Sequence, residues 1–162
     1  MKSPDYFKAG QTYTGIPYTQ SPNQVDDIKF INSMNNSDFY DPYFNSSKSM
    51  SKYGNDCSGF VSFVFYTDRH TTWSLVDDPK ITKLATLDDV QPGDAVVTNQ
   101  PGIEHTFIIY NVIGKTFYCY EQTPKLALAT VHSKNDLLNK GYIGIRNKDW
   151  GNMIPTLQTE TN

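Results

Sequence analysis

The stretch YGNDCSGFVSFVF, residues 53–65, joins a turn-forming run to an apolar run and sets a cysteine between them. Asn55 and Asp56 are helix-capping residue types, so a helix is predicted here that ends by Asp68. Its apolar side would be formed by Phe60, Val61, Val64 and Phe65. Cys57 then falls on the first turn, where unpaired N–H groups and the positive end of the helix dipole stabilise a thiolate.

Cys57 has three interpretations: a nucleophile, half of a disulfide, or a buried small hydrophobe. Ser58 and Gly59 are small and leave room above the sulfur for a substrate. Burial is nevertheless the commoner role for a lone cysteine at a helix start. The second cysteine, Cys119, alternates with Phe117 in an apolar run and is predicted to be a core thiol. A regulatory disulfide between Cys57 and Cys119 is the alternative.

A catalytic thiol needs a base, usually histidine, held by a third group. The chain has three histidines. His70 lies in the polar stretch DRHTTW and is interpreted as a surface residue, whereas His132 ends a predicted strand and fits either role. His105 begins HTFIIYN after a glycine-bearing loop, which places it at a strand end on the rim of a sheet. His105 is therefore the candidate base.

Composition bounds the partners of the protein. The 162 residues suit one domain over 1–162, with an irregular arm over 1–23 and a frayed tail over 152–162. The net charge of −3, with scattered Lys and Arg, does not fit a nucleic-acid binder. No segment approaches the ~20 apolar residues of a membrane span.

No C-x-x-C or H-E-x-x-H spacing indicates a metal site, and neither a metal nor a cofactor is predicted.

Periodicity predicts helices first and an antiparallel meander afterwards, which is typical of the α+β class. A helix is expected from Gln24, followed by a polar loop to about Asn55 and then the helix at residue 58. The expected strands are 95–98, 105–111, 115–121, 126–133 and 141–146, where 105–111 and 115–121 form a hairpin around VIG. A short helix should lie between the last two strands, with Ser133 as its cap and Gly141 as its stop.

Three blocks in order, DCSGFVSFVF, QPGDAVVT and IEHTFIIYN, resemble the NlpC-type cell-wall cysteine peptidases. That family places D-C-S-G before a helix, P-G-D before a strand, and a histidine at the start of the next strand. The resemblance covers about residues 50–122, and GIPYTQ at 15–20 resembles the G-x-P-Y stretch that often precedes the nucleophile. It implies a papain-like α+β fold, shared with the related CHAP amidases, with N-terminal helices packed on an antiparallel sheet.

The resemblance implies that Cys57 is the nucleophile and His105 the base. The third residue depends on the hairpin. A three-residue turn centred on Ile113 pairs His105 with Glu121, and a two-residue Ile113–Gly114 turn pairs it with Gln122. Glu121 is preferred, because CHAP-like relatives place a Glu at a similar distance and a carboxylate both orients and neutralises an imidazolium.

Oxyanion donors and substrate contacts complete the expected site. The Cys57 backbone N–H is the natural first donor, and Tyr18 is the candidate second donor by resemblance. Asp56 and Ser58 match family positions that can meet a free peptide amine. Helix capping is the structural role available to both residues, and the two roles can coexist.

The predicted function is hydrolysis of an amide bond in peptidoglycan by a Cys-His-Glu triad. A stem-peptide endopeptidase, with a D-glutamyl linkage favoured, is the first form. The alternatives are an N-acetylmuramoyl-L-alanine amidase of CHAP type, a non-catalytic wall-binding module on the same fold, and acyl transfer to another acceptor. Peptidoglycan or a muropeptide is the expected partner of a monomer. A secreted or cell-envelope location is expected, with any signal peptide outside this sequence, because MKSPDYFKAG lacks an apolar run.

Overall fold

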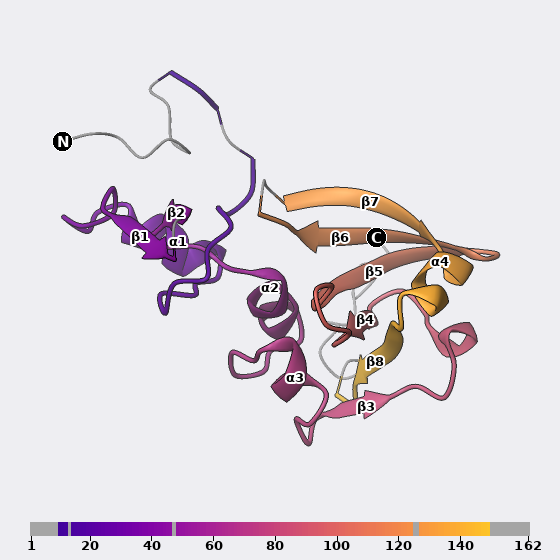
Figure 1. The fold of residues 1–162 in the computed structure, drawn as a ribbon. Helices are drawn as coiled ribbons and strands as arrows, with labels where there is room; N and C mark the ends of the chain where they lie inside the picture. The colour runs from indigo at the N-terminus through magenta and orange to yellow at the C-terminus, as the bar shows by residue number, and fades with distance from the viewer. Residues whose placement is uncertain (1–9, 13, 47, 125–126, 150–162) are drawn as a thin grey trace, which may run out of the picture.

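Six antiparallel strands in the order β3-β8-β4-β5-β6-β7 form the main sheet of the computed structural model (Figure 1). The structure describes residues 10–12, 14–46, 48–124 and 127–149. The strands are β3 (Ile81–Lys83), β4 (Ala95–Thr98), β5 (His105–Ile113), β6 (Thr116–Gln122), β7 (Ala127–Ser133) and β8 (Ile143–Asn147). β4 to β7 run as a meander, and β8 returns to lie between β4 and β3. The predicted α+β class with an antiparallel sheet is confirmed.

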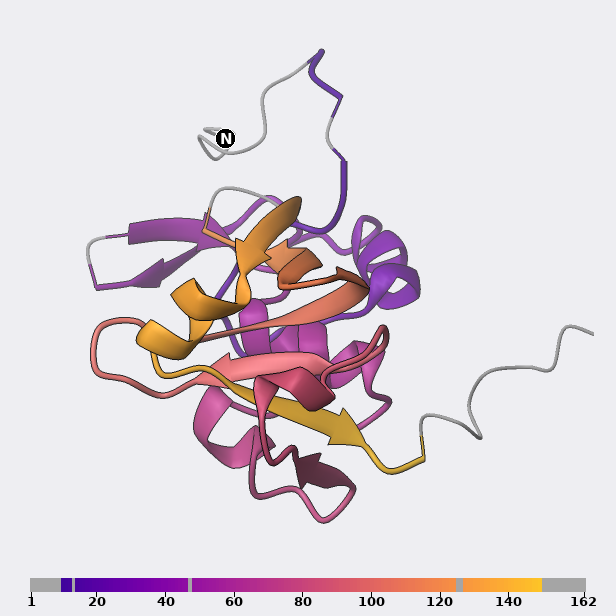
Figure 2. The same cartoon turned by 90° about the vertical axis from the view of Figure 1, so that its right-hand side faces the viewer.

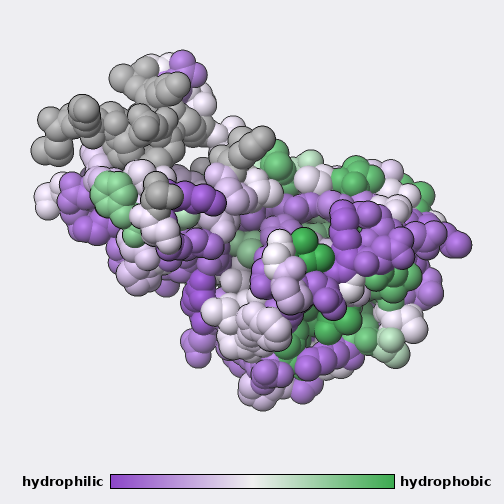
Figure 3. Space-filling model, viewed as in Figure 1, coloured by the Kyte–Doolittle hydropathy of each residue, from purple (hydrophilic) through white to green (hydrophobic). Residues whose placement is uncertain are grey.

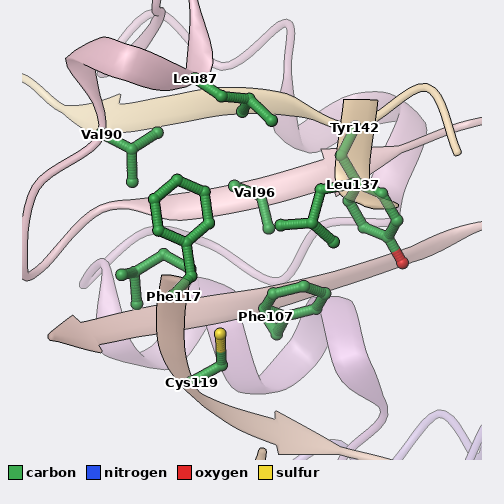
Figure 4. Packing of buried hydrophobic residues seen from close by; sticks show 9 residues of the cluster. Leu87, Val90, Val96, Phe107, Phe117, Cys119, Leu137 and Tyr142 are labelled. Carbon is green, nitrogen blue, oxygen red and sulfur yellow. The ribbon is translucent and has the colours of Figure 1, made fainter. Parts of the chain in front are cut away.

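Alternation along β4 and β5 builds a core on each face of the sheet. Val96 and Phe107 point into one cluster of buried residues, and Val97 and Ile108 point into the other. The first cluster is covered by α4 (Lys134–Asn139) and the 3₁₀ helix η1 (Leu87–Asp89), and Figure 4 shows its side chains pointing toward one another. The second cluster is covered by α2 (Cys57–Val64) and α3 (Thr72–Leu75). β4 is thus buried on both faces, whereas Tyr120 on β6 and Val131 on β7 are exposed. The sheet twists from β8 to β7 (Figure 2).

Local sequence signals set the ends of α2 and α4. The Asp56 carboxylate accepts from the Gly59 N–H at the start of α2, and the Ser133 hydroxyl accepts from the Asp136 N–H at the start of α4. Gly141, with φ of +70°, follows the end of α4 as expected. α2 then packs on β5 through the apolar side formed by Val61 and Phe65, which are fully buried.

The N-terminal part differs from the prediction. The stretch that was expected to be a polar loop contains a small hairpin of β1 (Pro42–Asn45) and β2 (Lys48–Ser51). The helix α1 (Asp27–Ser33) exists, but Ile28 and Ile31 on its apolar side are 68% and 62% exposed. Phe39 is the buried centre of this part, where its ring contacts Phe30 and Tyr53. In Figure 1 the hairpin and α1 lie at the end of the molecule away from α4.

The irregular arm is described from residue 10 onward apart from residue 13, and these residues hold no helix or strand beyond a single bridge from Tyr18 to Asn55. The predicted tail over 152–162 lies outside the described residues. Figure 3 shows a largely hydrophilic face, on which apolar side chains form separate small groups over the sheet.

The β5–β6 hairpin corrects both predicted turns. Ile113 pairs with Thr116, so the loop is Gly114–Lys115, and the register shifts between Ile109 and Asn111. The bulge adds one residue to β5. Without it, the two-residue loop would place Glu121 on the opposite face of the sheet from His105. Both expected registers were wrong, because the loop lies later in the chain than either predicted turn and the bulge shifts the pairing back by only one residue.

The motif PGD, residues 92–94, has a structural explanation. Gly93 adopts φ of +95°, a conformation that favours glycine, and turns the chain into β4. Asp94 is 1% exposed and binds the Arg146 guanidinium through both oxygens, with two N–O distances of 2.7 Å. It also accepts from the Gln91 N–H. This carboxylate therefore links the residue that precedes β4 to strand β8.

We expect Arg146→Leu to lower the free energy of unfolding by about 2 kcal/mol, because it leaves the Asp94 carboxylate buried without its counter-charge. Urea denaturation measures the difference. Lys29→Ala is the matched control, because it removes an exposed ion pair with Asp26 and should cost less than about 1 kcal/mol. Equal losses in the two variants would contradict the structural role given to Asp94.

Candidate active site

Cys57 is the first residue of α2, and its side chain is partly exposed. The cap fixes this end of the helix: Asp56 Oδ1 accepts from the Gly59 N–H at 2.7 Å and from the Ser58 hydroxyl at 3.0 Å. The Asp56 N–H in turn donates to Gln24 Oε1 at 2.9 Å. The backbone N–H groups of the first turn have no acceptor within the helix, so the Cys57 N–H is available to a bound group.

The N-terminal arm lies beside the start of α2. Thr19 N donates to the Asn55 carbonyl at 3.0 Å, and Asn55 N donates to the Pro17 carbonyl at 3.1 Å. Gly54 allows this close approach, since a Cβ there would lie 2.2 Å from the Pro17 oxygen. The pairing places Tyr18, as predicted, on the same cleft as Cys57.

His105 opens β5 and lies between the thiol and a carboxylate. Its Nε2 lies 3.0 Å from Glu121 Oε2, and its ring also hydrogen-bonds to the Cys57 side chain. Because Nε2 is bound to Glu121, Nδ1 is the nitrogen left for the sulfur. The structure thus brings together the three residues predicted from the sequence. Glu121 reaches His105 along a diagonal, since extending the Ile108–Tyr120 pair by one residue sets Glu121 opposite Phe107.

The charges of this group favour an imidazolium. Burial alone would lower the pKa of His105, but hydrogen bonds to Cys57 and Glu121 outweigh it and raise the pKa from 6.5 to about 9. Burial alone would raise the pKa of Glu121, but its hydrogen bonds, first that from His105, hold the pKa well below its usual range. His105 is therefore protonated at neutral pH beside an ionised Glu121.

Sequence reasoning missed two groups that bind Glu121. His132 Nε2 and the Thr130 hydroxyl both reach Oε1, the oxygen that His105 does not use. Both residues lie on β7 and point to the same face as Glu121. Strand alternation predicts that Thr130 and His132 lie on one face of β7. Placing that face beside Glu121 requires the β6–β7 register, which the sequence of the loop before β7 does not determine.

A cleft of about 400 Å³ opens over these groups. It is lined by Tyr18, Cys57, Ile103, Glu104, His105, Gln122, Thr123, Pro124, Lys140 and Tyr142. Burial first, and then the charges of Cys57 and Asp56, raise the pKa of Tyr18 to about 12, so its phenol keeps a proton to donate. The Tyr142 hydroxyl points out of the core cluster (Figure 4), and no sequence signal identified Tyr142 or Lys140 as cleft residues.

Three candidate residues have different surroundings from those expected. Asp56 and Ser58 are buried, do not line the cleft, and bind each other at the helix cap. Asp56 Oδ2 also accepts from Arg69 Nη2 at 2.6 Å, so its charge is already balanced. Gln122 lines the cleft, but its amide donates to the Ile16 carbonyl at 3.0 Å and helps to hold the arm.

The remaining cysteine and histidine lie elsewhere. Cys119 is a fully buried free thiol, and Figure 4 shows it in the core cluster as predicted. Burial first, and the Glu121 charge second, raise its pKa to about 12, which makes it unreactive. His70 is more buried than predicted: its Nε2 lies 2.7 Å from Asp78 and its Nδ1 lies 3.2 Å from the Ser74 hydroxyl. Neither Cys119 nor His70 lines the cleft.

Comparison with known proteins finds no family model, curated protein or solved structure that matches this chain. Within the described ranges, no helix combines the length and the apolar character needed to cross a membrane. The same residues contain no group of three or more His, Cys, Asp or Glu side chains arranged to hold a metal ion.

We expect Glu121→Gln to lower the pKa of His105 from about 9 toward 6.5, because an amide orients the ring without neutralising it. Proton–nitrogen NMR of the His105 ring across pH 5–10 measures this shift. In the wild type the raised pKa stabilises the fold fully below pH 6.5, and this contribution is lost as the pH rises through 9. In Glu121→Gln the loss should start at a lower pH.

Asp78→Asn is the control for that titration, since it alters the carboxylate that binds His70 and should leave the His105 resonances unchanged. A His105 pKa that stays near 9 in Glu121→Gln would show that the carboxylate does not set it.

Proposed function

We propose that the protein is a cysteine hydrolase that cleaves an amide bond of peptidoglycan. One observation carries the proposal: a partly exposed thiol at a helix start, an imidazole and a buried carboxylate form one hydrogen-bonded chain on the wall of a cleft. This is the arrangement that an activated nucleophile requires. Cys57 opens α2 and His105 opens β5, and the two residues lie far apart in the sequence, so their meeting is not a consequence of sequence proximity.

The reaction follows from these groups. The Cys57 thiolate attacks the amide carbonyl carbon, and the carbonyl oxygen takes up negative charge facing the Cys57 N–H and the Tyr18 hydroxyl. The His105 imidazolium then gives its proton to the amide nitrogen as the C–N bond breaks, which releases an amine and leaves a thioester on Cys57. Water attacks the thioester while His105 takes its proton. A carboxylic acid leaves, and the thiolate–imidazolium pair is restored.

The papain-like interpretation belongs to the same proposal. The three blocks of the NlpC resemblance occupy matching places: Cys57 opens α2, Asp94 precedes β4 and His105 opens β5. α2 also packs on the sheet that carries the histidine. These placements support a papain-like catalytic domain, and the cell-wall substrate comes from that resemblance.

The bond cleaved has two candidates. A stem-peptide endopeptidase acting at a D-glutamyl linkage is the form that the family blocks favour. Asp56, however, is balanced by Arg69 and does not line the cleft, so it gives no support to recognition of a free peptide amine. That observation favours an amidase at the sugar–peptide junction, which needs no such amine. Mass spectrometry of products from purified muropeptides separates the two: a cut within the stem supports the endopeptidase, and intact stems with a free L-alanine amine support the amidase.

Cys57→Ala should reduce hydrolysis of muropeptides by about 10³-fold or more, because no other group can form the thioester. Cys119→Ala is the matched control: it removes a buried thiol, so it should lower the melting temperature and leave the rate per folded molecule within about twofold. Chromatography of digests measures both. Hydrolysis that persists in folded Cys57→Ala would reject the mechanism.

Tyr18→Phe should lower kcat by about 10²-fold with little change in KM, if the phenol donates to the oxyanion rather than to the ground state. Tyr53→Phe removes a hydroxyl that binds Asp38 outside the cleft and serves as the control. Steady-state kinetics on a soluble muropeptide would show an unchanged kcat for Tyr18→Phe if the hydroxyl has no part in the reaction.

A further inference from the structure

The carboxylate of Glu121 has two oxygens with different partners. Oε2 faces His105 at 3.0 Å, and Oε1 binds His132 Nε2 and the Thr130 hydroxyl. The Glu121 side chain is 8% exposed, so its carboxylate depends on protein donors and not on water for its hydrogen bonds. The orientation of Oε2 toward His105 therefore depends on what binds Oε1.

His132 is held by the packing of its ring as well as by its hydrogen bond to Glu121. Its ring stacks on Phe107, with centroids 4.8 Å apart and an interplanar angle of 23°. Its backbone lies opposite Phe117 in the β6–β7 ladder. Phe107 and Phe117 are both fully buried core residues. An aromatic ring packed in this way has few rotamers, whereas the Thr130 hydroxyl can rotate to other acceptors.

We propose that His132 is a positioning residue of the active site: it anchors Glu121 Oε1 so that Oε2 stays directed at His105 and the imidazolium stays directed at Cys57. The hydrogen-bonded chain thus has four members on four elements, α2, β5, β6 and β7. This inference rests on the proposed function, since positioning matters only if the thiol is a nucleophile. His132 does not line the cleft, so it acts through Glu121 and not on the substrate.

The chemistry of a carboxylate explains why an anchor at its far oxygen matters. A carboxylate held at one oxygen can turn about its terminal torsion, which has a broad energy minimum. Binding at both oxygens removes that freedom, as outer partners do for ligating side chains at other sites. A neutral His132 donates only when it carries its proton at Nε2, and Glu121 favours that tautomer.

Other titratable groups lie around His105, and the test must leave these residues unchanged. Cys57 from α2 and Glu121 from β6 contact its ring. Tyr18 from the arm, Glu104 at the preceding position, and Lys140 and Tyr142 after α4 line the same cleft. The variants below leave all six unchanged, apart from the Glu121→Gln background used to close the cycle.

Alkylation of Cys57 by iodoacetamide provides a test that needs no substrate. The rate is measured by intact mass across pH 5–9, and Cys119 is too buried to react in the folded protein. We expect His132→Phe, which keeps a ring on Phe107 and removes the donor, to slow alkylation at pH 7 by about tenfold. The pH at half-maximal rate should rise by about one unit. His132→Gln, which can donate again, should restore the rate to within about threefold of wild type.

Three further variants separate a positioning role of His132 from a packing role. In the Glu121→Gln background, His132→Phe should change the rate by less than about twofold, because the residue acts only through the carboxylate. His70→Phe is the matched control, since it removes the histidine that binds Asp78 and should leave alkylation unchanged. If His132→Phe does not fold, Thr130→Val decides the matter, because a loss as large as tenfold would make Thr130 the anchor and overturn the inference.

The outcomes distinguish this inference from the proposed function. A wild-type Cys57 that reacts no faster than glutathione would end both. A fast wild-type thiol that is unaffected by His132→Phe would end the inference alone. An equal loss in the wild-type and Glu121→Gln backgrounds, or no restoration by His132→Gln, would give His132 a packing role and also overturn the inference.

Discussion

A buried carboxylate must be surrounded by donors, and this constraint on Glu121 organises the functional end of the molecule. Donors come from β5 on one side and from β7 on the other, so three adjacent strands must keep their register for the charge to be satisfied. The same charge stabilises a protonated His105, whose ring also hydrogen-bonds to the Cys57 side chain. The register of these strands therefore also decides whether His105 is held between Glu121 and Cys57.

A second buried carboxylate, that of Asp56, has a structural role at the start of α2. Its two oxygens are divided between the cap of α2 and Arg69, which fixes the position of Cys57 and leaves no charge for a ligand. The two carboxylates thus differ in function because of their partners. Glu121 is next to a group that can gain and lose a proton during a reaction, whereas Asp56 binds only permanent donors.

Much of the sheet and of the site could be predicted from sequence because the signals there are local. Ser133 and Gly141 bound α4, and Asp56 starts α2, through capping and backbone preferences that a few residues encode. The hairpin register could not be predicted, since it depends on a bulge near Tyr110 that no turn residue announces. Glu121 does lie beside His105, but the register used to place it was wrong: the loop lies later in the chain than predicted, and the bulge returns Glu121 to the face that His105 occupies.

The groups that were missed share a physical reason. His132, Thr130 and Tyr142 lie far from Cys57 in sequence, and each joins the site only after β7 and α4 fold back on the sheet. Sequence motifs mark the atoms that react, because their chemistry restricts the residue type. Residues that hold those atoms are restricted only by geometry, and several types can serve. The difference explains why Cys57 and His105 could be singled out from the sequence, while the residues that support Glu121 are recognised only in the folded structure.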